Sequence, residues 1–202
     1  MSLLGQDAHL GRLLATAREE RLHHCYLFEG PPSVGKRSAA EILARAAACT
    51  AQVAERPCGR CPTCGQMDKG HHPDLIHLEP DPTRKSGTIS VAQVRELIRQ
   101  VQLRPYNARW RTIIVDPVDM LMPQAANALL KTLEEPPRQT GFVLITSRVS
   151  SLLPTVLSRS QRVRFHAVPE EVLVPWLRAR GAPEPERIAR LAMGAPGQAL
   201  AL

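Results

Sequence analysis

Residues 25–38 read Cys-Tyr-Leu-Phe-Glu-Gly-Pro-Pro-Ser-Val-Gly-Lys-Arg-Ser. The first five form an apolar run typical of a buried strand. Residues 30–36 then match the first seven positions of G-x-x-x-x-G-K-[ST], and an alanine-rich helix is expected over residues 38–48. In this order, the backbone N–H groups of the loop, the helix N-terminus and Lys36 can bind phosphate. The stretch predicts a phosphate loop, and a glycine-rich turn without a ligand is the alternative.

The eighth position of the motif departs from this pattern. It normally carries a Ser or Thr whose hydroxyl binds Mg²⁺, but here it is Arg37, which cannot ligate a cation and repels one. Ser38 comes one residue too late, roughly 100° around the helix. We therefore expect ATP or ADP to bind weakly or not at all. The residues expected around such a ligand are Gly30, Pro31, Ser33, Val34, Gly35, Lys36, Arg37 and Ser38.

A second acidic motif departs from its usual form as well. Residues 113–116 read Ile-Ile-Val-Asp, an apolar strand that ends in a carboxylate suited to a Walker-B role. Many ATPases of this kind follow that Asp with a Glu that activates the attacking water. Here Pro117 follows Asp116, and Asp119 comes three positions on. Two departures in two catalytic elements predict little or no ATP hydrolysis.

Four of the five cysteines lie in one short window with x8-x2-x2 spacing: Cys49, Cys58, Cys61 and Cys64. In a cytoplasmic chain such clustering favours a metal over disulfides. Four thiolates fill a closed tetrahedral site, so we expect a structural zinc ion rather than free or redox-active cysteines. The fifth, Cys25, is expected to be a small buried apolar side chain. Three nearby histidines are alternative ligands but suit solvated loop positions better: His71, His72 and His77.

Strands and helices alternate along the rest of the chain. Strands are expected at residues 75–78, 111–116, 141–146 and 163–165, and helices at 2–22, 90–103 and 124–133. This alternation predicts an α/β domain with a mostly parallel sheet over residues 1–167. The cysteine-rich module at about 49–74 is inserted in that domain, and two short helical stretches within 168–202 form a partial lid.

The 202 residues carry a net charge of +7, are 44% hydrophobic and only 3% aromatic. The apolar fraction excludes wholesale disorder, and the apolar runs are too short to span a bilayer. The first residues lack a cationic start, a long apolar stretch and a small-residue cleavage site, so we expect a cytoplasmic protein. A basic chain can contact DNA, but a GC-rich genome that enriches Arg, Ala and Pro explains the charge equally well. The scarcity of aromatic residues argues against stacking on single-stranded bases.

In this order the motifs resemble bacterial DNA polymerase III clamp-loader subunits of the AAA+ superfamily, over essentially the whole chain. The most specific segment is Ala-Ala-Asn-Ala-Leu-Leu-Lys-Thr-Leu-Glu-Glu-Pro-Pro at residues 125–137. Leu-Ser-Arg-Ser at residues 157–160 is similar to the family's Ser-Arg-Cys motif. The other matching segments are Leu-Gly-Gln at 4–6, residues 24–36, the cysteine module and residues 113–116.

Two kinds of subunit in this family share a zinc-bearing AAA+ domain: the ATP-hydrolysing gamma/tau motor and the delta-prime subunit, whose nucleotide motifs are commonly degenerate. Arg37 and Pro117 favour the delta-prime kind, as does Gln198, since the sensor-2 stretch at 194–198 usually has an Arg there. The resemblance then implies a rigid, non-hydrolysing stator in a ring-like pentamer that opens the sliding clamp and places it on primer-template DNA. Its partners would be the gamma/tau and delta subunits, with the clamp contacted indirectly.

The resemblance also gives Arg159 a role in trans. It matches the Arg of Ser-Arg-Cys, which would act as an arginine finger at a neighbouring motor's ATP site. Ser160 replaces the family's Cys, which should matter little because the Arg carries the chemistry. Without the resemblance, Arg159 is an ordinary surface arginine. Thr146 and Ser147 match the sensor-1 region. The helix in the 125–137 segment has one face that carries Asn127, Lys131 and Glu134, and this face is either an interface or solvated.

Two other functions fit parts of the sequence. An active gamma/tau-like ATPase would tolerate Arg37 and show Mg²⁺-dependent hydrolysis. A zinc-dependent DNA-binding module with a vestigial ATPase core would bind DNA with an affinity that falls steeply with salt. Family members also carry a helical collar domain that assembles the pentamer. No segment of residues 1–202 matches the collar domain, so we expect no stable pentamer from this chain alone.

Overall fold

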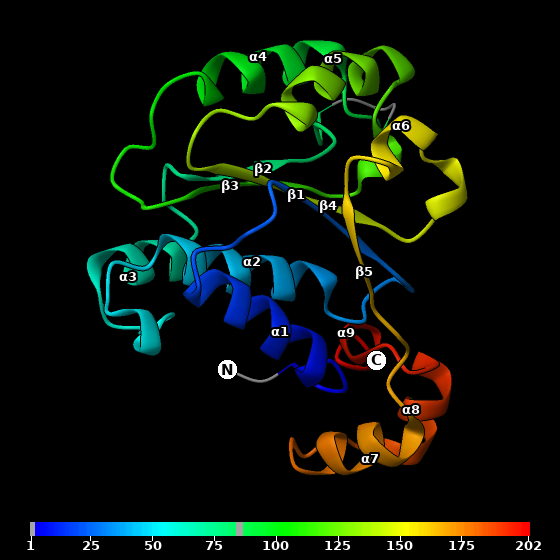
Figure 1. Ribbon diagram of the computed structural model, residues 1–202. Coiled ribbons are helices and arrows are strands. Elements are labelled where there is room, and N and C mark those ends of the chain that lie inside the picture. Colours follow the sequence, from blue (N-terminus) through cyan, green and yellow to red (C-terminus); the bar gives the residue numbers. More distant parts are fainter. Residues whose placement is uncertain (1–2, 84–86) are drawn as a thin grey trace.

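The computed structural model describes residues 3–83 and 87–202 and shows a five-stranded sheet between two layers of helices, with a small helical lid (Figure 1). All neighbouring strands run parallel, in the order β2-β3-β4-β1-β5. The parallel sheet predicted from the alternation of elements is therefore confirmed. The strands are β1 (Cys25–Glu29), β2 (Leu75–Leu78), β3 (Arg111–Val115), β4 (Thr140–Thr146) and β5 (Gln161–Arg164).

Helices cover both faces of the sheet, because successive side chains of a strand point to opposite faces and those on both faces are apolar. In β3, Ile113 and Val115 pack against one layer, while Ile114 packs against the other. In β1, Leu27 and Phe28 divide in the same way. Both faces of the sheet are therefore apolar and buried. One layer contains α1 (Asp7–Arg18) and α2 (Lys36–Ala48), and the other contains α4 (Val91–Val101), α5 (Pro123–Glu134) and α6 (Pro154–Leu157).

The carboxyl ends of the strands meet at one edge of the sheet, because the strands are parallel. β1 lies between β4 and β5, and β3 lies between β2 and β4. Ligands of open α/β sheets bind at this edge. The strand order therefore brings together the loop after β1, Asp116 after β3 and Thr146 at the end of β4.

Several element boundaries differ from the expectation. The first helix begins at Asp7 rather than at residue 2, because Gly5 turns the chain with a φ of +70°; residues 1 and 2 lie outside the described range. The last strand ends at Arg164 rather than at residue 165. The cysteine module, which has no visible periodicity, contains a 3₁₀ turn (Val53–Glu55) and α3 (Pro62–Asp68). A capping box at Ser90 begins α4 at the expected place.

Residues 168–202 form a small helical lid with its own core. The lid has three helices rather than the two expected: α7 (Glu170–Arg178), α8 (Pro185–Ala192) and α9 (Pro196–Ala199). Leu173, Leu177 and Ile188 are buried between them. The lid contacts the phosphate loop where the N–H of Gly197 donates to the O atom of Ser33 at 2.9 Å.

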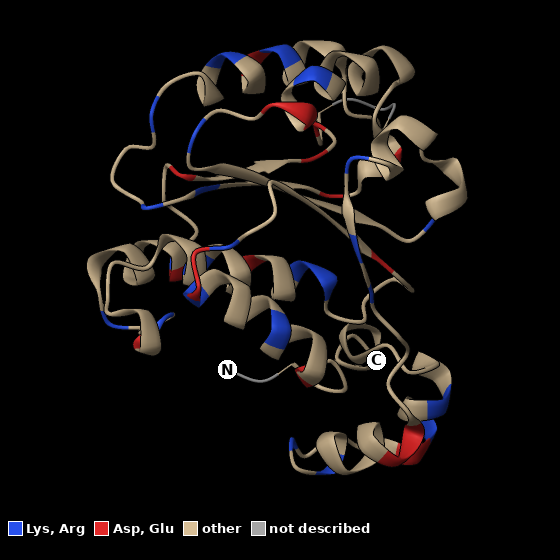
Figure 2. Cartoon of the chain, viewed as in Figure 1, with Lys and Arg blue, Asp and Glu red and all other residues tan. Residues whose placement is uncertain are grey.

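Charged residues are distributed over much of the fold. Figure 2 shows Lys and Arg on both helical layers, on β5 and on the lid. The basic residues therefore do not gather on a single element. No helix within residues 3–83 and 87–202 is long and apolar enough to cross a membrane.

Candidate functional site

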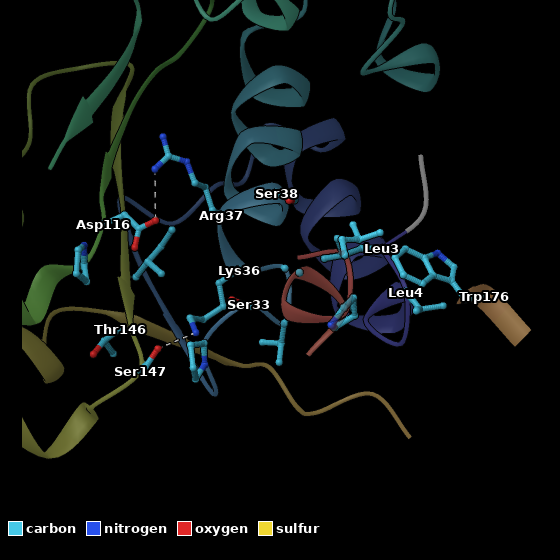
Figure 3. A pocket seen from close by; sticks show the side chains of 18 of the residues that line it. Leu3, Leu4, Ser33, Lys36, Arg37, Ser38, Asp116, Thr146, Ser147 and Trp176 are labelled. Carbon is cyan, nitrogen blue, oxygen red and sulfur yellow. Dashed lines mark hydrogen bonds and ion pairs between the residues drawn. The ribbon is translucent and has the colours of Figure 1, made fainter. Parts of the chain in front are cut away.

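The phosphate loop borders a cavity of about 680 Å³ at the carboxyl edge of the sheet (Figure 3). Asp116 and Ser147 line it from the strand ends, and Trp176 and Gly197 line it from the lid. Leu3 and Leu4 lie close to Trp176, and the guanidinium of Arg180 lies over the Trp176 ring, 3.9 Å from its centroid. This end of the cavity therefore combines apolar surface with a positive charge, beside a loop of N–H donors that suits a phosphate. The expected loop residues that line the cavity are Ser33, Val34, Gly35, Lys36, Arg37 and Ser38.

Two glycines shape the loop. Gly30 has a φ of +144°, and a Cβ there would lie 2.2 Å from the O atom of Phe165. Gly35 immediately precedes α2, has a φ of +99° and packs against the side chain of Leu3. Both positions therefore require glycine, as the motif predicted.

The ammonium group of Lys36 is buried and turned onto the loop itself. Its Nζ donates to the O atom of Gly30 at 2.6 Å, to the O atom of Pro31 at 2.5 Å and to Oγ of Ser147 at 3.2 Å. Burial lowers the pKa of Lys36, and nearby carboxylates, Asp116 foremost, act in the opposite direction. Lys36 thus already has three acceptors, which a bound phosphate would have to replace.

The guanidinium group of Arg37 lies beside the Walker-B position. Its Nη1 is 2.6 Å from Oε1 of Glu79 and 3.7 Å from Oδ2 of Asp116, and its Nε is 3.2 Å from Oε1 of Glu41. Figure 3 shows the side chain reaching from α2 to Asp116. One cation therefore faces three carboxylates, which come from α2 and from the segments that follow β2 and β3.

The sequence analysis predicted none of the side-chain partners of Arg37. Glu41 could have been found, because it lies four residues from Arg37 on the same helix. Glu79 and His77, whose Nδ1 is 3.4 Å from Nη2 of Arg37, are close only because β2 pairs with β3. Consecutive strands of an alternating α/β chain commonly pair, but the sequence does not show which side chains this pairing brings to Arg37.

Both acids of the Walker-B segment are already engaged. Burial raises the pKa of Asp116, although Arg37 acts against that shift. Asp119 accepts a hydrogen bond from Oγ1 of Thr146 at 2.7 Å and another from Nη2 of Arg148 at 2.9 Å. Its side chain is only 5% exposed. Asp116 thus lies near one cation, and Asp119 has two hydrogen-bond partners within the chain.

The four thiols of the cysteine module form one cluster, as their spacing predicted. Their sulfur atoms all lie within 4.8 Å of one another. Sγ of Cys49 is 3.6 Å from Sγ of Cys58 and 3.9 Å from Sγ of Cys61. Sulfurs bound tetrahedrally to Zn²⁺ at about 2.3 Å lie roughly 3.8 Å apart. The positions of Cys49, Cys58, Cys61 and Cys64 therefore fit a zinc ion.

Backbone N–H groups point at two of these thiols. The N–H of Cys61 donates to Sγ of Cys58 at 3.3 Å, and the N–H of Cys64 donates to Sγ of Cys61 at 3.4 Å. Burial acts to raise the pKa of Cys61, but hydrogen bonds from the backbones of Cys64 and Thr50 outweigh it and lower the pKa to about 6. Donors of this kind stabilise the thiolate form, which is the form that binds metals.

The nearby histidines lie outside this cluster, which among the described residues consists of cysteines. His72 is 3% exposed, so the expectation that it is a solvated loop residue is wrong. Its Nδ1 accepts a hydrogen bond from the backbone of Asp74 at 3.0 Å, which explains the burial. His77 lies beside Arg37 instead.

Arg56 attaches the cysteine module to the rest of the domain. Its side chain is 4% exposed, with Nε donating to the O atom of Ala51 at 2.8 Å and Nη1 lying 3.0 Å from Oε1 of Glu20. Glu20 also pairs with Arg109, from the loop before β3. This connection was not predicted from the sequence, because Glu20, Arg56 and Arg109 are far apart in the chain.

Arg159 lies in the turn between α6 and β5, outside the lining of the cavity at the phosphate loop. Its side chain is 28% exposed and pairs with Glu134 at the end of α5. The adjacent Ser160 has its Oγ 3.3 Å from Sγ of Cys25. Cys25 is buried, as expected, and burial raises the pKa of its thiol to about 11. The structure thus places Arg159 at the surface on a turn anchored to β1.

A profile of the family described as DNA polymerase III, delta subunit, matches residues 5–169. The chain belongs to this family. Its relatives include the DNA polymerase III subunit delta' of Escherichia coli, 34% identical over 194 residues, which are 95% of this chain and 58% of that protein. The tau/gamma subunit of Haemophilus influenzae is 37% identical over 168 residues, 83% of this chain and 24% of that protein. The chain thus spans from 24% to 58% of the length of these two relatives.

The fold of this chain is also found in solved structures. A DNA polymerase III gamma subunit-related protein of Thermotoga maritima matches this chain with a TM-score of 0.59 at 24% identity. The match covers 91% of this chain and 58% of that protein. The RuvB branch migration motor of Thermotoga maritima has a TM-score of 0.61 at 15% identity, over 98% of this chain and 60% of that one. The predicted α/β fold of the AAA+ type is confirmed. The delta' relative is 34% identical to this chain and the tau/gamma relative 37%, so family membership does not distinguish the two kinds of subunit.

Proposed function

We propose that this chain is a clamp-loader subunit of DNA polymerase III that does not hydrolyse ATP and acts as a stator. The observation that carries the proposal is the position of Arg37, whose guanidinium is paired with Asp116 and Glu79 beside the phosphate loop. Phosphoryl transfer in these ATPases depends on Mg²⁺ held between the loop hydroxyl and the Walker-B Asp. Arg37 removes the hydroxyl and presents a positive charge to the same carboxylate, so the site is unsuited to Mg²⁺.

The remaining catalytic parts support the same proposal. Asp119 is held by Thr146 and Arg148, and Pro117 occupies the position of the water-activating Glu. Lys36 is held by carbonyl oxygens of the loop. Each group that would act on ATP thus has a partner within the chain. ATP or ADP is expected to bind weakly or not at all.

The proposal includes a zinc ion and a set of partners. Zinc would be held by the four clustered thiols and would fix the fold of the cysteine module, since four protein ligands leave no position open for chemistry. The partners are the gamma/tau and delta subunits, with primer-template DNA within the complex and the sliding clamp contacted indirectly. Arg159 would stabilise the charge that develops at a neighbouring motor's ATP site.

Phosphate release by the purified chain tests the lack of hydrolysis. With ATP and Mg²⁺ we expect no release above that of the Lys36→Ala variant, because the magnesium site is occupied by Arg37. The exposed Lys131 provides the matched control, Lys131→Ala. Calorimetry should show no gain in ATP affinity on adding Mg²⁺, whereas Arg37→Thr should acquire such a gain. Mg²⁺-dependent turnover that Lys36→Ala alone abolishes would favour the gamma/tau-like ATPase instead.

A reconstituted loader tests the role of Arg159. With the full-length subunit carrying Arg159→Ala, the ATP turnover of the motor subunits should fall by about 10- to 100-fold, because an arginine finger stabilises the transition state. The exposed Arg95 gives the matched control, Arg95→Ala, which should leave turnover unchanged. Assembly should be intact in both. Unchanged turnover in Arg159→Ala would overturn the trans role.

DNA titration of the chain without partners tests the remaining alternative. A zinc-dependent DNA-binding module would bind duplex DNA with an affinity that falls steeply as salt rises. We expect no such binding at physiological salt, because the basic residues are spread over both helical layers rather than gathered on one element (Figure 2).

A further inference from the structure

Two motifs that lie far apart in the sequence meet in the structure through one ion pair. Glu134 is the last residue of α5, the helix that carries the most specific segment of the sequence. Arg159 follows α6, which packs against α5 (Figure 1). Nη2 of Arg159 pairs with Oε1 of Glu134. Glu134, which the sequence places on a face that is either an interface or solvated, thus has a charged partner within the chain.

The guanidinium group is held at more than one point. Nη1 of Arg159 donates to the O atom of Thr155 at 2.9 Å and lies 3.4 Å from Oγ of Ser158. Together with Glu134, these contacts fix a long side chain that would otherwise sample many rotamers. Its exposed fraction is 28%, against 47% for Glu134. The end of the arginine is thus ordered while part of it stays open to solvent.

The turn that carries Arg159 is itself fixed to the core. Oγ of Ser160 donates to the O atom of Val156 at 2.8 Å and contacts Sγ of Cys25 in β1. The backbone N–H groups of Arg159 and Ser160 donate to Val156 and Leu157 at 3.3 Å each. Backbone and side chain are therefore both held, and the carboxylate of Glu134 supplies the charged contact to the guanidinium.

We infer that Glu134 is a positioning residue for Arg159, holding the guanidinium in the orientation in which it meets an anion of a neighbouring subunit. This inference rests on the proposed trans role of Arg159. A guanidinium has five N–H donors; the contacts to Thr155 and Ser158 use both N–H groups of Nη1, and the contact to Glu134 leaves one N–H of Nη2 unused. Glu134 can therefore stay in place while Arg159 faces a phosphoryl group. A preorganised donor stabilises a transition state better than one that must first be ordered.

ATP turnover of a loader reconstituted with the full-length subunit tests this inference. Glu134→Ala should lower kcat of the motor by about 3- to 10-fold with KM for ATP unchanged, because misorientation of a catalytic group acts on the transition state. Glu134→Gln keeps an oxygen acceptor in the same place and should stay within about two-fold of wild type. The adjacent exposed Glu135 provides the matched control, Glu135→Ala, which should have no effect.

A double-mutant cycle separates positioning from a general effect on structure. In the Arg159→Ala background, Glu134→Ala should cause no further loss, since it acts only through Arg159. An additional loss there, or equal losses in Glu134→Ala and Glu134→Gln, would overturn the inference. So would a normal rate in Glu134→Ala when Arg159→Ala is slow, although the proposed function would then stand. A normal rate in Arg159→Ala would instead remove the proposed function on which the inference rests.

Discussion

Removing zinc is expected to unfold the cysteine module and to lower the melting temperature of the chain by about 10 °C or more. The segment from residue 49 to residue 74 has few buried apolar side chains of its own, foremost Met67. Four thiols within 4.8 Å of one another, which repel when ionised, need a cation to hold them together. Binding of a structural zinc ion by such ligands contributes about 10–16 kcal/mol in small zinc-finger peptides, and that free energy is coupled to folding.

Metal analysis and thermal melts check this prediction. Mass spectrometry under native conditions should find one zinc ion per chain, and Cys58→Ser should lose it. Cys25 gives the matched control, because it is a buried cysteine outside the cluster: Cys25→Ala should keep its zinc. The result that would contradict the prediction is a chain without zinc whose melting temperature a chelator leaves unchanged.

Asp74→Ala is expected to reduce the free energy of unfolding by about 3–5 kcal/mol, because it leaves a buried arginine without its counter-charge. Asp74 is 0% exposed and accepts two hydrogen bonds from Arg111, each at 3.2 Å. Its oxygens also accept from the N–H groups of Tyr106, Asn107 and Ala108 at 2.9, 3.1 and 3.0 Å. One carboxylate therefore organises the loop between α4 and β3, and its loss leaves the buried N–H groups of Arg111 and three loop N–H groups without this acceptor.

Denaturant titration of Asp74→Ala measures this loss, and Asp68→Ala gives a matched control. Asp68 makes an ion pair with Arg45 but is 47% exposed, so its removal should cost at most about 1 kcal/mol. Comparable losses in the two variants would contradict the assignment of Asp74 as the organising residue of the loop.

The contribution of Asp74 to the free energy of unfolding should depend on pH. Burial acts to raise its pKa, but the three backbone N–H groups and Arg111 outweigh burial and lower the pKa below its usual value of 3.8. A depressed pKa in the folded state means that the carboxylate contributes stability above pH 3.8, which is lost as the pH falls through the folded pKa. The difference in unfolding free energy between wild type and Asp74→Asn should therefore shrink below pH 4.

The phosphate loop and the cysteine cluster could be predicted because their signals are local. Residues 25–28 before the loop are apolar or aromatic, the loop spacing is fixed, and the ligand cysteines lie within 16 residues of one another. Helix boundaries were less accurate. α1 starts at Asp7 because a turn at Gly5 interrupts an otherwise helical apolar pattern, and the lid has a third helix of only four residues, too short for any periodicity to show.

The sequence by itself determined the α/β fold, the family, the loss of the magnesium-binding hydroxyl at Arg37 and the four thiols of the cysteine module. Only the tertiary structure decided which groups those residues meet. Arg37 faces Glu79 because β2 pairs with β3, and Arg159 meets Glu134 because α6 packs on α5. Motifs depend on spacing along the chain, whereas ion pairs between distant segments depend on the order in which strands and helices pack.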